Sequence, residues 1–98
     1  MKWFTRAANR GLAEVQYNLG LMYYNGYGVP QDYAQAREWI MEAANRDNAK
    51  AQYNLGLMFE HGLGVCQSRA NAKRSFRRAC GNGEQKGCDN YRRLDENR

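Results

Sequence analysis

The six-residue sequence Tyr-Asn-Leu-Gly-Leu-Met occurs at residues 17–22 and again at residues 53–58, so the offset between the two copies is 53 − 17 = 36 positions. A short sequence that recurs at a fixed offset indicates a repeat architecture, in which each unit buries its apolar face against a neighbouring unit. Such an offset restricts the fold more than composition does, because every unit must then adopt the same local structure.

The correspondence extends well beyond the repeated hexapeptide. Residues 15–50 align with residues 51–86 without a gap, and identical residues recur along the whole alignment. In the same register, residues 3–10 (WFTRAANR) align with residues 39–46 (WIMEAANR). Chance does not produce such a register, so the chain is a tandem array.

Each unit is predicted to form two helices. The first runs from about Ala13 to Tyr24, a stretch without proline or a run of β-branched residues. Residues 25–31 contain two glycines and a proline, which end that helix. Asp32 is the expected N-cap of a second helix that runs to about Arg46.

Two glycines lie in the middle of predicted helices, at Gly20 and Gly56. Glycine inside a helix costs about 0.5–1 kcal/mol relative to alanine. We expect compensation from the paired helix, which can approach closely where no Cβ is present. Stacked helical hairpins of this kind form an α-solenoid.

The pattern AxYNLGxMYxxGxGVxxDxxxAxxWxxxAA closely resembles the Sel-1-like repeat, a relative of the tetratricopeptide repeat. The resemblance implies an all-α fold, an α/α superhelix that is a right-handed solenoid of antiparallel helix pairs. The second copy departs from the pattern at Ser75, where the first has Trp39, and at Ser68, where the first has Asp32. These departures are expected to weaken the local core and to mark a C-terminal unit. The expected division is a single domain with a partial second helix at 1–12, full repeats at 13–48 and 49–84, and a C-terminal capping helix at 85–98.

The spacing of Cys80 and Cys88 resembles the AC-x(7)-C arrangement of cysteine-rich, secreted bacterial members of this family. The resemblance implies a disulfide that ties the second helix of one unit to the first helix of the next. The internal alignment places these cysteines at the positions of Ala44 and Gln52, across the same inter-repeat turn. The alternative is two reduced thiols. Cys66 would then be the unpaired thiol, exposed in a loop.

The expected cellular compartment depends on the redox state of the cysteines and on the N-terminal residues. A disulfide would indicate a periplasmic or secreted protein, and reduced thiols a cytoplasmic one. The first residues lack the apolar region of a signal peptide, and no apolar run is long enough to span a membrane. We therefore expect either a cytoplasmic protein or a fragment of a longer array. Trp3 and Phe4 would lack a first-helix partner, so the open N-terminal end is expected to self-associate.

Catalysis is not indicated by the sequence. Gly26-x-Gly28 and Gly62-x-Gly64 lack the third glycine and the preceding strand of a dinucleotide site. The residues that could bind zinc or form a Cys/His nucleophile pair are His61, Cys66, Cys80 and Cys88. Their spacing matches no known metal site, and Cys80 and Cys88 are expected in a disulfide. The carboxylates form no pair for acid–base chemistry. The prediction is a non-enzymatic protein without cofactor or metal.

Binding is expected on the concave face, which the resemblance assigns to the first helix of each unit. With the mid-helix glycines at the close contact, eight residues point inward: Tyr17, Leu21, Tyr24, Asn25, Tyr53, Leu57, Glu60 and His61. Tyrosine is frequent at binding hot spots. Because Tyr17 and Tyr53 are identical in both copies, the alternative is that they belong to the repeat core. Glu60 and His61 differ from their first-copy counterparts and are expected to tune specificity.

The net charge of +5 is concentrated after residue 66. Lys73, Arg74, Arg77 and Arg78 form a basic stripe on the last second helix, extended by Arg92 and Arg93. Such a stripe fits an acidic protein surface or a nucleic acid backbone, or is simply a solvated face.

The predicted function is a protein-interaction scaffold that binds a peptide or protein partner on the concave face. One alternative, implied by the cysteine-rich relatives, is β-lactam or peptidoglycan-fragment binding with weak β-lactamase activity. The other is nucleic acid binding through the basic C-terminal end.

Overall fold

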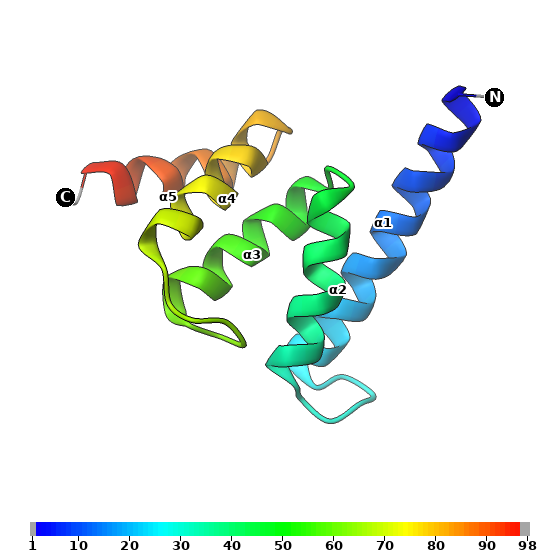
Figure 1. The fold of residues 1–98 in the computed structure, drawn as a ribbon, viewed down its shortest axis with the longest axis horizontal. Coiled ribbons are helices and arrows are strands. Elements are labelled where there is room, and N and C mark those ends of the chain that lie inside the picture. Colours follow the sequence, from blue (N-terminus) through cyan, green and yellow to red (C-terminus); the bar gives the residue numbers. More distant parts are fainter. Residues whose placement is uncertain (1, 97–98) are drawn as a thin grey trace.

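The computed structural model describes the backbone of residues 2–96 and the side chains of residues 11–96. This part of the chain contains five helices and no strand: α1 Lys2–Asn25, α2 Tyr33–Asn45, α3 Ala49–His61, α4 Arg69–Gly81 and α5 Gln85–Glu96. Each helix packs against the next one along the chain, which produces the stepwise array seen in Figure 1. The predicted all-α helical solenoid is confirmed. None of the described helices is long and apolar enough to cross a membrane.

The helices begin where the sequence provides a capping side chain. The Asp32 carboxylate accepts hydrogen bonds from the backbone N–H groups of residues 34 and 35, as predicted. Asn48 caps α3 in the same way, accepting from the N–H of Ala51 at 2.8 Å. Ser68 keeps the cap of α4 despite the change from aspartate, because its Oγ accepts from the N–H of Asn71 at 3.2 Å.

The two mid-helix glycines lie where paired helices approach closely, as expected. A Cβ on Gly20 would lie 2.5 Å from Ile40 Cγ1, and a Cβ on Gly56 would lie 2.5 Å from Phe76 Cε1. Both contact residues are fully buried. The absence of a side chain at these glycines therefore permits the helix spacing within each unit.

The interior is made mainly of alanine, with a few larger apolar side chains. One core cluster forms around Ile40 and Met58, and the other around Phe76 and Leu94. Ser75, at the position of Trp39, is also buried. The other buried apolar side chains are those of Leu55 and of the seven alanines Ala13, Ala36, Ala43, Ala44, Ala51, Ala72 and Ala79.

The predicted disulfide between Cys80 and Cys88 is present and joins α4 to α5. At the preceding inter-repeat turn the same two positions are joined differently, because Gln52 Nε2 donates to the carbonyl oxygen of Ala44 at 3.0 Å. A covalent bond in the last unit thus replaces a hydrogen bond in the one before. Cys66 is free and exposed, as expected.

The expected helix boundary between residues 12 and 13 is not observed, because α1 continues from Lys2 to Asn25. At the equivalent turn in the next unit, Asp47 adopts a left-handed conformation (φ 65°) and Asn48 caps α3. The corresponding residues are Gly11 and Leu12, and leucine has no side-chain acceptor to cap a helix. The helix therefore runs through this position.

The continuous α1 leaves part of its surface uncovered. Val15 is 55% exposed, whereas its counterpart Ala51 is fully buried beneath the preceding helix. Gln16 donates to Glu42, but its Oε1 is buried without a hydrogen-bond partner among the described residues. The side chains of Trp3 and Phe4, on which the expected self-association rests, lie outside the described residues.

Candidate functional site

Side chains of α3 contact those of α1 and of α5 on the face that carries the predicted binding residues. Asn54 Nδ2 of α3 donates to the Tyr17 hydroxyl of α1 at 3.4 Å. The Arg93 guanidinium of α5 makes a two-pronged contact with the Glu60 carboxylate of α3, with both N–O distances at 2.8 Å. We call this surface of α1, α3 and α5 the inner face. Tyr17 of α1 lies toward one end of it and Arg93 of α5 toward the other.

The N-terminal half of the inner face is aromatic. Tyr17 and Tyr24 are half-buried and pack against the first core cluster. The Tyr24 ring meets the Tyr33 ring edge-to-face, with the centroids 5.4 Å apart. Burial raises the pKa of both Tyr17 and Tyr24, and the neighbouring phenols of Tyr33 and Tyr53 add to the pKa increase at Tyr24. These phenols stay protonated and can donate or accept hydrogen bonds.

The middle of the face also belongs partly to the core. Tyr53 and Leu57 are half-buried against the second core cluster, and the Tyr53 ring lies 5.8 Å from that of Phe76. Both therefore contact the core, as the alternative expectation for Tyr17 and Tyr53 had it for the tyrosine, while part of each side chain stays accessible. Leu21 is half-buried, and Asn25 and His61 are exposed.

The C-terminal half of the inner face is charged. The hydrogen bond from Arg93 lowers the pKa of the Glu60 carboxyl, assisted by the charges of Arg93, His61 and Arg69. The same hydrogen bond raises the pKa of Arg93. His61 Nε2 lies 3.9 Å from Glu60 Oε1, so this imidazole joins the ion pair only when it is protonated.

The repeat alignment explains why the inner face is aromatic in its N-terminal half and charged in its C-terminal half. Glu60 occupies the position of Tyr24, and Arg93 occupies the position of Leu57. Tyr24 of the first unit and Leu57 of the second are thus replaced, one unit later, by the two members of an ion pair. The inner face offers tyrosine rings at one end and fixed charges at the other.

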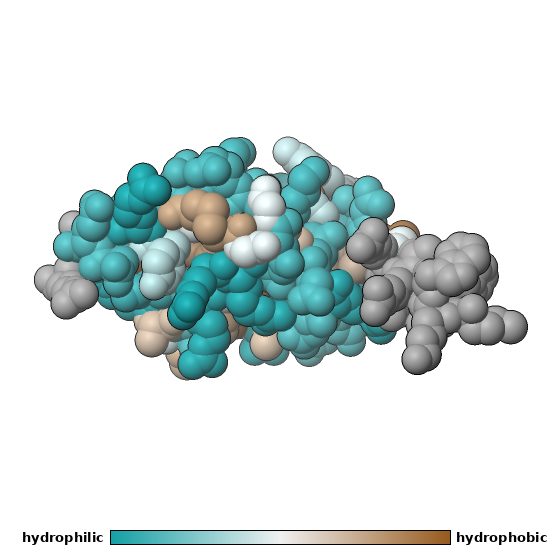
Figure 2. Space-filling model, turned by 90° about the horizontal axis from the view of Figure 1, so that it is seen from above, coloured by the Kyte–Doolittle hydropathy of each residue, from teal (hydrophilic) through white to brown (hydrophobic). Residues whose placement is uncertain are grey.

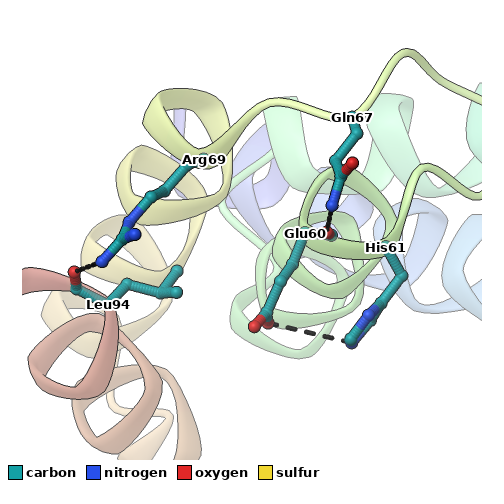
Figure 3. Close-up of a pocket in the computed structure, with 5 residues that line it drawn as sticks. All are labelled: Glu60, His61, Gln67, Arg69 and Leu94. Atoms are coloured by element: carbon teal, nitrogen blue, oxygen red, sulfur yellow. Dashed lines mark hydrogen bonds and ion pairs between the residues drawn. The ribbon is translucent and has the colours of Figure 1, made fainter. Parts of the chain in front are cut away.

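A pocket of about 530 Å³ opens at the charged end, between the C-terminal ends of α3 and α5 and the loop before α4. Figure 3 shows its five lining residues, with Arg69 and Leu94 on one side and Glu60, His61 and Gln67 on the other. Arg69 Nη2 donates to the carbonyl oxygen of Leu94 at 2.6 Å, and Gln67 Nε2 donates to that of Glu60 at 2.8 Å.

Glu60 and His61 were predicted as binding residues, whereas Gln67, Arg69 and Leu94 were not. The available signal was the replacement of Tyr33 by Arg69 in the alignment.

The predicted basic stripe is divided by its contacts. Lys73 pairs with Asp95 at 3.0 Å and lies over the Tyr91 ring. Arg78 turns to the opposite side, where it donates to the Ala44 carbonyl oxygen at 3.2 Å. Arg74 and Arg77 are exposed between them. The surface seen in Figure 2 is mostly hydrophilic, with apolar side chains in small separate groups.

The predicted absence of a metal centre concerned His61 and the three cysteines. Within the described residues, no group of three or more His, Cys, Asp or Glu side chains is arranged to hold a metal ion. Two of the cysteines are joined in the disulfide, and Cys66 lies in a separate loop.

Comparison with known proteins gives one family and two informative structures. The model of the Sel1 repeat matches residues 1–12, 13–48 and 49–84. No curated protein matches the chain. A Sel1 repeat protein from Oxalobacter formigenes is similar in structure, with a TM-score of 0.79 and 31% identity over 92% of this chain and 37% of that chain. The protective antigen c5321 of uropathogenic Escherichia coli, which displays an SLR fold, has a TM-score of 0.76 and 47% identity over 89% of this chain and 19% of its own. The chain therefore spans well under half of either protein.

Proposed function

Because the chain belongs to the Sel1 repeat family, whose members generally mediate protein–protein interaction and are typically non-enzymatic scaffolds, we propose that it binds a peptide or protein partner along the inner face. The observation that carries this proposal is the row of half-buried tyrosines on α1 and α3. A tyrosine held by the core offers a rigid contact surface and loses little side-chain entropy when a partner binds.

The charged end of the inner face supports specificity rather than affinity. The Glu60–Arg93 pair is already formed, and its carboxylate is 16% exposed, so a partner need not order it. Charges of this kind penalise the wrong partner through unfavourable juxtaposition. We expect the partner to place uncharged or hydrogen-bonding groups over this end.

The disulfide supports residence in an oxidising compartment, since such bonds are kept reduced in the cytoplasm. It also strengthens the likeness to the cysteine-rich members, from which the alternative of β-lactam binding or hydrolysis came. A nitrocefin assay tests that alternative directly. Nucleic acid binding is supported less, because Lys73 and Arg78 are engaged with protein groups.

The proposed function is tested by crosslinked capture from an extract of the source cell. The inner-face variant is Tyr24→Ala with Asn25→Ala, both in the first unit and away from the pocket. The matched control is Glu38→Ala, whose side chain is 67% exposed on α2. Circular dichroism checks that both variants fold.

We expect the wild type and Glu38→Ala to recover the same specific protein and the double variant to lose it. Recovery of an identical set by all three proteins would show that the inner face is not the binding surface.

A further inference from the structure

The residues that line the pocket at the charged end have counterparts in the first unit. With the offset of 36, its residues Glu60, His61, Gln67, Arg69 and Leu94 correspond to Tyr24, Asn25, Gln31, Tyr33 and Met58. In the first unit the rings of Tyr24 and Tyr33 meet edge-to-face at the corresponding position, with their centroids 5.4 Å apart. In the second unit Glu60 and Arg69 are instead bonded to α5, through Arg93 and the carbonyl oxygen of Leu94. The space between them stays open, as Figure 3 shows.

A glutamine present in both units indicates what could fill the open site. Gln31 Nε2 donates to the carbonyl oxygen of Tyr24 at 2.9 Å and to the Tyr33 hydroxyl at 3.2 Å. Gln67 Nε2 makes the equivalent bond to the carbonyl oxygen of Glu60, at 2.8 Å. Residue 69 is arginine, so this unit supplies no phenol at the position of the Tyr33 hydroxyl.

We propose that the pocket binds a tyrosine side chain of the partner, in the place that the Tyr33 ring occupies in the first unit. The guest hydroxyl accepts a hydrogen bond from Gln67 Nε2, and its ring packs against the buried Leu94 side chain. The Arg69 guanidinium supplies a cation for the ring face. This inference rests on the proposed function, because it adds an anchor to a partner that lies along the inner face.

The size of the pocket suits this guest, and the Glu60 carboxylate works against an acidic one. A volume of about 530 Å³ falls in the range of small-ligand sites, roughly 300–1,000 Å³, and is enough for a ring and its adjoining backbone. A carboxylate or phosphate would bring negative charge beside Glu60, which is held ionised by Arg93. A phenol ring carries no net charge and uses the available N–H donor.

The test is a nuclear magnetic resonance titration of the 98-residue chain with N-acetyl-tyrosine amide and, separately, N-acetyl-phenylalanine amide. We expect saturable shifts confined to the amides of residues 60–69 and Leu94. The tyrosine compound should bind about fivefold to tenfold more tightly, the effect of one hydrogen bond. The absence of saturable shifts, or equal binding of both compounds, would overturn the proposal.

The chain itself provides the blocking variant. Arg69→Tyr restores the residue of the first unit, so its own ring should fill the pocket and abolish binding of the tyrosine compound. The control is Arg74→Tyr, the same change at an exposed position of α4 outside the pocket. It should leave binding unchanged. Binding that persists in Arg69→Tyr would place the compound elsewhere and reject the pocket.

A second variant covers the case in which Arg69→Tyr does not fold. Gln67→Met removes the donor at similar length, so the preference for tyrosine over phenylalanine should disappear. A preference that survives this change would contradict the assigned hydrogen bond.

The pocket and the proposed function can fail separately. If partner capture depends on Tyr24 and Asn25 but the tyrosine compound does not bind, the pocket inference alone is wrong. If the compound binds in the pocket but the Tyr24→Ala, Asn25→Ala variant still captures the partner, the proposed function is wrong.

Discussion

Replacing Gly56 by alanine should destabilise the protein, although alanine is the better helix former. The new Cβ would lie 2.5, 2.6 and 2.9 Å from three carbons of the Phe76 ring. That ring is fully buried and packs on Tyr53, so it has little room to move. Overpacking of this kind costs about 1–3 kcal/mol. The higher helix propensity of alanine returns roughly 0.8–1 kcal/mol. We expect a net loss of up to about 2 kcal/mol in the free energy of unfolding.

The assay is urea unfolding followed by far-ultraviolet circular dichroism, with Gly11→Ala as the control. Among the described residues, no atom outside the backbone of the helix itself lies within 4 Å of a Cβ built at Gly11, so only the propensity gain applies there. The variant Phe76→Leu completes a double-mutant cycle, in which the smaller side chain should relieve part of the cost of alanine at position 56. If Gly56→Ala stabilises the protein as much as Gly11→Ala does, the close approach of α3 and α4 is wrong.

Three further predictions concern α1, the disulfide and the ion pair. Gly11→Ala should raise the free energy of unfolding by up to about 1 kcal/mol if α1 is continuous, whereas a turn at this position would make the change neutral or unfavourable in the same urea experiment. Replacing both Cys80 and Cys88 by alanine should cost about 2–3 kcal/mol by the loop-entropy model for a separation of eight residues. Hydrogen exchange should show reduced protection of the backbone amides first in α5. Equally reduced protection along the whole chain would contradict a local stabilising role of the disulfide. Glu60 has a folded-state pKa below its ordinary value of 4.5, so its stabilisation is present above that pH and is lost as the pH falls through the folded value. Glu60→Gln should therefore flatten this acid dependence of stability and cost about 1 kcal/mol at neutral pH, and an unchanged profile would mean that the bond to Arg93 is not formed in solution.

The local rules of helix formation predicted most of the fold. Asp32 caps its helix as predicted, and the glycines at 20 and 56 lie against the paired helices. These features depend on a few neighbouring residues and on the repeat register. Both kinds of information can be read along the chain.

The repeat register predicts a helix boundary after residue 12, but the local sequence provides no cap there, so α1 is continuous. The turn before α3 requires Asn48 to cap the helix, and the corresponding leucine at position 12 cannot do so. A register inherited from neighbouring units indicates where a turn belongs. Side-chain chemistry at that position decides whether it forms.

The pocket was not predicted because it depends on which groups the long side chains of Glu60 and Arg69 bind. Glu60 and Arg69 have opposite charges and line the same pocket, which suggests a pair between them. Each instead bonds to a residue of α5, so the room between them stays open. The alignment reveals the loss of the two tyrosine rings, but the choice of new partners requires the positions of residues about 25 to 33 apart in sequence.

The alanine-rich interior has a consequence for the shape of the array. Ala43 and Ala44 of α2 and Ala51 of α3 are fully buried in the same core cluster, so these two helices meet partly through methyl groups. Alanine loses almost no side-chain entropy on burial, and it also leaves no flexible group to absorb a change. A larger residue here would push the units apart and alter the rotation from one unit to the next. These buried methyl groups therefore set the angle between neighbouring units. Through that angle they also set the distance between the tyrosine-rich and charged ends of the inner face.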